Sequence, residues 1–167
     1  MKTTKKLSLI AVVTLITLFS SCSKSDPTPA PTAIISDKTN FKLDGILIVP
    51  DETYATYYTN AVAGGKFIDV YAKKDGKQVL ELHFPATIGT YPAQHSFNMT
   101  SSWLTYIAND GTNNPQDFNS TSGSISFTIL NITTDKIRGI FNFVGNNSVS
   151  NKNVTDGVLV IDAITHQ

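Results

Sequence analysis

One stretch of the sequence decides the fold class: Gly123-Ser-Ile-Ser-Phe-Thr-Ile-Leu-Asn-Ile-Thr-Thr-Asp-Lys-Ile-Arg-Gly-Ile-Phe-Asn-Phe143. Large apolar residues alternate with small or polar ones on both sides of positions 133–135, and this period of two is typical of β-strands. The stretch therefore predicts an antiparallel hairpin with a three-residue loop at 133–135. This loop sets Phe127 opposite Phe141, and it sets Ile129 opposite Gly139, with all four residues on the inward face.

A second hairpin is expected around Asp75-Gly76, a residue pair that favours tight turns. Apolar and polar residues alternate on both sides of this pair. A two-residue turn would place Val70 opposite Glu81 and would mix the two faces of the sheet. We therefore expect an odd-length loop with Gly76 in the left-handed conformation, which sets Val70 opposite Leu80.

The rest of the chain after residue 33 has the same character. Short runs rich in Ile, Val, Phe, Tyr and Thr are separated by Gly, Asn and Asp, and helical apolar stripes are absent. Strands are expected near residues 40–49, 53–60, 66–73, 77–84, 102–108, 123–132, 136–145 and 157–165, whereas 85–101 gives no clear pattern. These patterns predict an all-β domain over residues 34–167, an antiparallel β-sandwich or flattened barrel of about 8–10 strands.

Residues 1–21 have the layout of a secretory signal peptide. Lysines at positions 2, 5 and 6 precede a 13-residue run, Leu7–Phe19, which only Ser8, Thr14 and Thr17 interrupt. An uncleaved membrane anchor is the alternative, but a spanning helix needs about 20 apolar residues. The sequence favours cleavage after residue 21.

The segment Leu18-Phe19-Ser20-Ser21-Cys22 resembles the lipobox of bacterial lipoproteins, with Phe19 where the lipobox usually has Leu. The resemblance implies that the Cys22 thiol receives a diacylglycerol, that a peptidase cuts before Cys22, and that the new amine is acylated. Cys22 is the only cysteine of the chain, so it has no internal disulfide partner. We therefore expect Cys22 to be the lipidation site and the membrane to be a partner through this anchor.

Residues 22–33 follow as the lipidated cysteine and a linker that is rich in proline. Prolines favour an extended, semi-rigid conformation that holds a domain away from a surface. Without residues 1–21 the chain keeps 10 basic and 13 acidic residues, a net charge of about −3. This charge argues against nucleic-acid binding, which needs a basic face. We expect a location in the cell envelope, anchored to the outer membrane on its periplasmic or surface side.

The hairpin quoted above resembles an uncharacterised family of Gram-negative lipoproteins with Gly-x-Ile-x-Ile and Gly-x-Phe-x-Phe strands. Two further segments share in the resemblance, Val154-Thr-Asp-Gly-Val158 and Ile88-Gly-Thr-Tyr91. It covers about the last half of the chain, and its motifs are typical of β-structure in general. It implies an exported lipoprotein with an all-β fold, and it brings no activity, cofactor or catalytic residue with it.

Catalytic motifs are absent from the sequence. No nucleophile elbow, phosphate loop or dinucleotide fingerprint occurs, and the three histidines lack metal-ligand spacing. Three weaker readings stay open. Glu81 and His83 with Asp69 across the hairpin form an acid–base pair, a weak metal site or a solvated polar face. Carboxylates at Asp44, Asp51 and Glu52 suit glycoside chemistry, and the loop 109–119 offers oxygen ligands to calcium. We expect no enzyme activity, no metal and no cofactor.

Aromatic residues are the best candidates for ligand binding. Tyr54 and Tyr58 share one strand face, and Trp103 and Tyr106 follow on a later strand. Exposed aromatic rings stack on sugars and also serve protein interfaces. The sequence thus favours a non-catalytic binding or interaction module, with a glycan-binding accessory lipoprotein as the alternative. Exposed coplanar rings would favour the glycan, and buried rings would favour the interaction module.

Overall fold

A computed structural model describes residues 36–167, apart from residues 63, 97–100 and 110–114. The predicted signal peptide, Cys22 and the predicted linker lie outside the described residues. Ile34–Gln167 forms one compact unit. Its described part is all strand, turn and loop, which confirms the all-β class. No helix that is long and apolar enough to cross a membrane occurs in the described ranges.

Eleven strands form a single sheet, and all neighbouring pairs are antiparallel except β11 with β3. The order is β11-β3-β4-β5-β7-β8-β9-β10-β1-β2, and β6 pairs with β8. The strands are β1 (Asn40–Leu43), β2 (Ile46–Ile48), β3 (Glu52–Asn60), β4 (Gly65–Lys74), β5 (Lys77–Pro85), β6 (Thr90–Pro92), β7 (Trp103–Ala108), β8 (Gln116–Asn131), β9 (Lys136–Asn146), β10 (Asn151–Ile161) and β11 (Ile164–His166).

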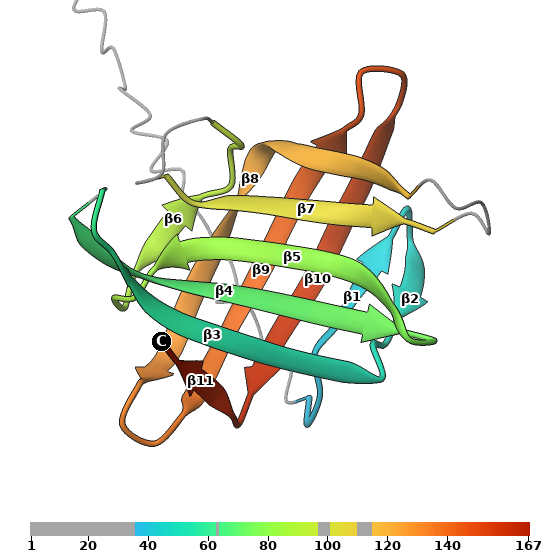
Figure 1. The fold of residues 1–167 in the computed structure, drawn as a ribbon. Helices are drawn as coiled ribbons and strands as arrows, with labels where there is room; N and C mark the ends of the chain where they lie inside the picture. Colours follow the sequence, from blue (N-terminus) through green and yellow to red (C-terminus); the bar gives the residue numbers. More distant parts are fainter. Residues whose placement is uncertain (1–35, 63, 97–100, 110–114) are drawn as a thin grey trace, which may run out of the picture. The chain divides into compact units, whose positions relative to one another are not determined.

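The sheet curls into a half-barrel with two walls. Strands β3, β4, β5 and β7 form the front wall, which crosses β8, β9 and β10 of the back wall at a steep angle (Figure 1). Apolar side chains of both walls fill the space between them, and the rings of Phe84 and Phe127 lie 4.3 Å apart between centroids. One hydrophobic core therefore stabilises the curled shape of the sheet, as in packed sheets whose inner faces interdigitate.

The register of the β4–β5 hairpin differs from our prediction. Val70 lies opposite Leu82 instead of Leu80. Asp75 and Gly76 both have positive φ, 53° and 72°, so they form a tight two-residue turn of the type that fits twisted strands. Val79 is an extra residue in β5 and forms a bulge. The bulge places the apolar residues of both strands on the same, inward face, which is the effect that we expected from an odd-length loop.

The hairpin β8–β9 is also present, but its register prediction was wrong. Phe127 lies opposite Gly139, not Phe141, and the loop has four residues. A bulge after Phe127 reverses the alternation, so that Ile129 is 46% exposed while Leu130 packs against the core. A bulge changes which side chains face inward without any change in the turn residues, and the alternation therefore did not reveal it.

Thr39 connects the segment before β1 to the C-terminal end of β10 by hydrogen bonds. Its hydroxyl donates to the carbonyl of Val160 and accepts from the Val160 amide, both at 3.0 Å, and its side chain is buried. Thr39→Val keeps the shape and leaves both backbone groups unpaired, so we expect a loss of about 1–3 kcal/mol in the free energy of unfolding. Urea denaturation measures the loss. Thr53→Val is the control, because the Thr53 hydroxyl makes no hydrogen bond within the described residues, and it is expected to change stability by less than about 0.5 kcal/mol. Equal effects of the two changes would contradict this role.

Candidate functional site

The outer face of the front wall brings together most of the aromatic candidates. Strand β4 buries Ile68, Val70 and Ala72, so the alternate residues point away from the core. Cross-strand partners lie on the same side of a sheet, and the pairs Tyr54–Tyr71, Tyr58–Phe67, Asp69–His83 and His83–Trp103 follow this rule. We define the outer face by the side chains of Tyr54, Thr56, Tyr58, Phe67, Asp69, Tyr71, Lys73, Glu81, His83, Trp103 and Thr105.

A stack of rings runs across this face. Phe67 and His83 are 5.0 Å apart between centroids and 12° from parallel, and His83 and Trp103 are 5.2 Å apart and 13° from parallel. Tyr58 extends the stack beside Phe67, and His95 contacts the ring of Trp103. The stack buries the side chains of Phe67 and His83 although they lie on the outside of the wall. Packing between the rings therefore orders this surface.

A hydrogen-bonded centre lies within the stack. His83 Nδ1 is 2.6 Å from Asp69 Oδ1, and the Tyr58 hydroxyl lies 3.5 Å from the same oxygen. A carboxylate only accepts hydrogen bonds, so the N–H group at Nδ1 is the donor of this hydrogen bond and Asp69 Oδ1 is its acceptor. Burial, followed by the charge of Asp69, raises the pKa of Tyr58 to about 12. Nε2 of His83 is buried and has no hydrogen-bond partner among the described residues.

A second aromatic pair lies one row away. The rings of Tyr54 and Tyr71 stack at 5.4 Å, and Lys73 Nζ lies 4.9 Å from the centroid of Tyr54. Glu81 is the cross-strand partner of Tyr71. Burial and then the charges of Asp69 and Glu81 raise the pKa of Tyr71. Burial and the charge of Asp69 also raise the pKa of Glu81. This part of the outer face therefore combines aromatic rings with negative charge.

Removing the charge of Glu81 is expected to stabilise the domain at neutral pH. Folding raises the pKa of the Glu81 carboxyl. The free energy of unfolding therefore decreases as the pH rises from the ordinary pKa of the acid through the raised one, because in this range the folded state binds the proton more tightly than the unfolded state does. Glu81→Gln should therefore raise the melting temperature at pH 7 and leave it unchanged below about pH 4, where the carboxyl is protonated in both states. Thermal unfolding between pH 3 and pH 8 checks this; a variant less stable than wild type at pH 7 would contradict it.

The structure separates the four predicted aromatic residues. Tyr54, Tyr58 and Trp103 lie on the outer face. Tyr106 lies on the inner side of β7, opposite Leu80, and its ring contacts Phe41 and Phe118. Phe67 and Tyr71 also lie on the outer face and were not among the predicted residues, although their alternation with Asp69 along β4 was a signal for it. Cys22, the predicted lipidation site, lies outside the described residues.

The weaker chemical readings find little support in the geometry. Asp44 bonds to Lys152 and to the Asn153 amide, and these contacts lower its pKa. Asp51 accepts the amide of Asp75, and Glu52 pairs with Lys73. No group of three or more His, Cys, Asp or Glu side chains is arranged as a metal site within the described part of the chain. The loop 109–119, for which calcium was only a weaker reading, lies partly outside the described residues.

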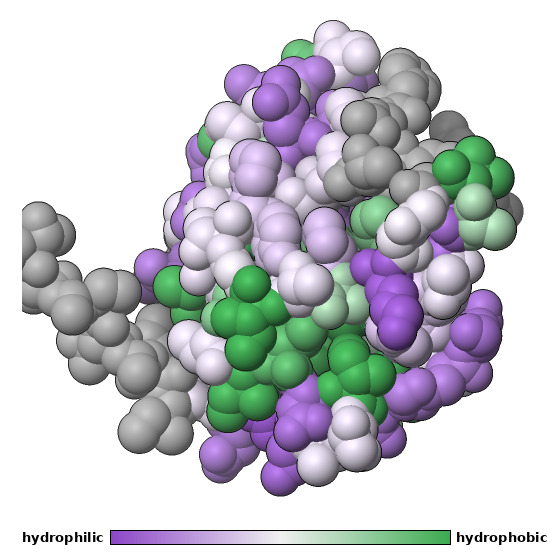
Figure 2. Space-filling model, turned by 90° about the vertical axis from the view of Figure 1, so that its left-hand side faces the viewer, coloured by the Kyte–Doolittle hydropathy of each residue, from purple (hydrophilic) through white to green (hydrophobic). Residues whose placement is uncertain are grey.

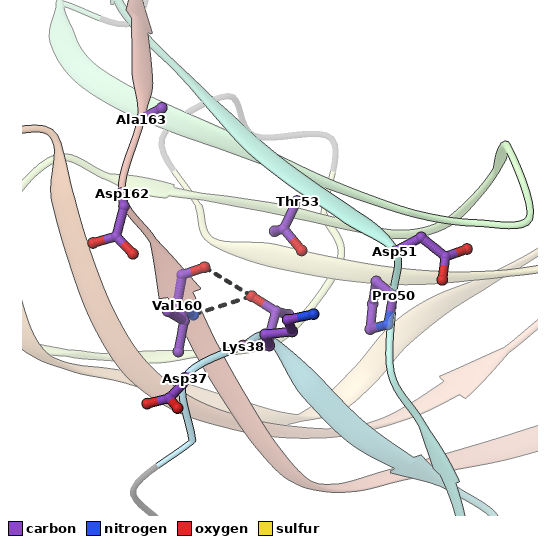
Figure 3. A pocket seen from close by; sticks show the side chains of 9 residues that line it. Asp37, Lys38, Pro50, Asp51, Thr53, Val160, Asp162 and Ala163 are labelled. Atoms are coloured by element: carbon purple, nitrogen blue, oxygen red, sulfur yellow. Dashed lines mark hydrogen bonds between the residues drawn. The ribbon is translucent and has the colours of Figure 1, made fainter.

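A hollow of about 300 Å³ lies where β1, β3 and β10 approach each other (Figure 3). Asp37, Asp51 and Asp162 line it, and the dashed lines mark the bonds between Thr39 and Val160. Asp51 is engaged with the Asp75 amide and Asp162 with Arg138, at 2.7 and 2.5 Å. These carboxylates hold turns and strand ends together, which accounts for them without a ligand.

One end of the half-barrel is apolar. Figure 2 shows the side that lies at the left in Figure 1, and apolar atoms gather in its lower part. Ile88, before β6, is 65% exposed, and Ile129, near the end of β8, is 46% exposed. Nothing in the structure shows what would cover these apolar side chains, so the ordered outer face remains the stronger candidate site.

Comparisons with protein-family models, with curated proteins and with solved structures found no match for this chain.

Proposed function

We propose that this chain is a lipoprotein of the cell envelope, anchored through Cys22, whose β-domain is a non-catalytic module that binds a protein partner through the outer face. The observation that supports binding is the ring stack of Phe67, His83 and Trp103, with Tyr58 beside it, on the outside of the wall. The outward face of a sheet with one wet side is ordinarily polar. Here it carries ordered rings, hydroxyls and carboxylates.

A surface of this kind suits protein recognition. Tyrosine and tryptophan dominate the energetics of protein interfaces because they offer large contact area and a polar group with few rotatable bonds. The stack holds the rings of His83 and Trp103 13° from parallel, so little side-chain freedom remains to be lost on binding. The Tyr58 hydroxyl and the Asp69 carboxylate supply polar contacts at its edge.

A glycan fits this surface less well than a protein does. Sugars stack on an open ring face. His83 stacks on Trp103 and Tyr71 stacks on Tyr54, so each of these rings has a face covered by a neighbour. His95 also contacts the ring of Trp103, and Lys73 also contacts the ring of Tyr54. The rings of Tyr54, Tyr58 and Trp103 are half-buried, so they are neither the open rings expected for a glycan nor fully buried. The covered ring faces therefore lead us to prefer the interaction module to the glycan-binding accessory role.

The anchor part of the proposal comes from the sequence. The lipobox-like segment ends at Cys22, and residues 23–35 separate it from the first described residue. At about 3.1 Å per residue, residues 23–32 would reach about 30 Å if they were extended. The domain would then be held near the outer membrane with its outer face free to meet other envelope proteins.

Site-specific photo-crosslinking in intact cells tests the binding face. A photoreactive phenylalanine analogue replaces Thr56 on the outer face, and in a matched control it replaces Thr128 on the back wall. We expect a discrete protein adduct from position 56 and none from position 128. No adduct at position 56, or the same adduct from both positions, would overturn the proposal.

A further inference from the structure

We propose that the partner meets the outer face with a cationic side chain, a lysine or arginine of a peptide segment, which pairs with Glu81 beside Tyr71. This inference rests on the proposed function, because it specifies the partner of the same surface. Three observations support it. No lysine or arginine within the described residues pairs with Glu81, aromatic rings lie beside Glu81, and two further carboxylates lie near it.

Glu81 is a part-buried carboxylate without a cation. One hydrogen bond reaches it, from Gln78 Nε2 to Oε2 at 3.2 Å. Lysine and arginine ion pairs within the described residues go to Asp44, Glu52, Asp156 and Asp162, and none goes to Glu81. A partly desolvated charge is unfavourable until it is paired, so an incoming ammonium or guanidinium group would relieve this cost.

The aromatic neighbours also suit a cation. Tyr71 lies across from Glu81, and its stack on Tyr54 covers one of its two faces. The electron-rich face of an aromatic ring attracts ammonium and guanidinium groups. The protein already places one cation on this pair, since Lys73 Nζ lies 4.9 Å from the Tyr54 centroid. Lys73 is paired with Glu52 at 3.4 Å and therefore does not neutralise Glu81.

The charge of the surroundings points the same way. Burial, and then the charges of Asp69 and Asp117, raise the pKa of Glu81, against opposing contributions from the Gln78 hydrogen bond and from His83. Asp117 is exposed on β8, opposite Ile107 of β7. A second copy of this chain would bring its own Asp69 and Glu81 to this surface, and its one outer-face lysine, Lys73, is already paired with Glu52. A metal ion would find no cluster of three ligating side chains within the described ranges. Charge complementarity therefore favours a basic peptide.

The test uses the only tryptophan of the chain as its reporter, since Trp103 lies on the outer face. The full chain in a nonionic detergent at pH 8 is titrated with the peptide acetyl-Gly-Arg-Ala-Arg-Gly-amide while Trp103 fluorescence is recorded. The same peptide with citrulline in place of arginine is the neutral match. Glu81→Gln removes the negative charge that is proposed to pair with the arginine peptide. Asp37→Asn is the control, because it removes a negative charge in the hollow beside β10.

We expect the arginine peptide to bind about tenfold more tightly than the citrulline peptide. Glu81→Gln should remove most of this difference, Asp37→Asn should keep it, and added salt should weaken it because the charges are partly exposed. Equal binding of the two peptides would overturn the cationic partner while the binding face stands. No response to either peptide would also overturn it, and the crosslinking at position 56 then decides the proposed function separately.

Discussion

The full chain carrying Cys22→Ala is expected to lose its membrane association completely. The lipobox-like segment offers one thiol for lipid, and no other cysteine can replace it. Two or more acyl chains anchor a protein stably, whereas none leaves only weak surface contacts. On phase separation of a detergent extract, wild type should enter the detergent phase and Cys22→Ala the aqueous phase. Intact mass should show a lipid-modified chain that begins at Cys22 in the wild type alone.

Ser23→Ala is the control for this change, because it alters the neighbouring residue and leaves the thiol in place. It should partition like the wild type. An unmodified wild-type mass, or wild-type protein in the aqueous phase, would contradict the anchor and would place the domain in a periplasmic or secreted role.

Gly123→Ala is expected to be the most damaging single-methyl change in the domain. Gly123 lies within β8 with a φ of 131°, and a side chain there would meet the carbonyl oxygen of Asn142 and, at 2.5 Å, the Cα of Phe143. Neither contact can move, since both belong to the backbone of β9. Backbone strain and overpacking each cost about 1–3 kcal/mol, so we expect a loss of about 3–5 kcal/mol in the free energy of unfolding.

Gly76→Ala separates the two contributions. Gly76 also has a positive φ, 72°, but no atom lies within 4 Å of the added methyl. It should cost about 1–2 kcal/mol, the strain alone. Urea denaturation of both variants gives the comparison. A Gly123→Ala protein as stable as Gly76→Ala would show that β8 and β9 do not approach each other as closely at this point.

The period of two along the chain was sufficient to predict the all-β class and most of the inward residues. It could not give the register, because two bulges change the alternation in the middle of strands. One is Val79 in β5, and the other follows Phe127 in β8. The Asp44-Gly45 turn, which divides the expected strand 40–49 into β1 and β2, was present in the sequence and was overlooked.

The outer face could be predicted in part. Alternation placed Tyr54 with Tyr58 and allowed Asp69 to lie across from His83, and both relations are confirmed. Trp103 and Tyr106 are three residues apart in one strand and therefore face opposite ways, which the sequence alone could have shown. The ring stack itself depends on which strands become neighbours. The pairing of β5 with β7 skips β6, and local patterns do not contain that information.

Radical footprinting of the aromatic side chains tests the binding face most directly. Oxidation rates of Tyr54, Tyr71 and Trp103 are compared between the full chain in intact envelopes and the chain purified in detergent. Tyr91 on β6, away from the outer face, serves as the internal control. We predict that the three outer-face residues oxidise several times more slowly in envelopes while Tyr91 does not change. Unchanged rates at all four residues, or an equal decrease that includes Tyr91, would contradict a partner on this face.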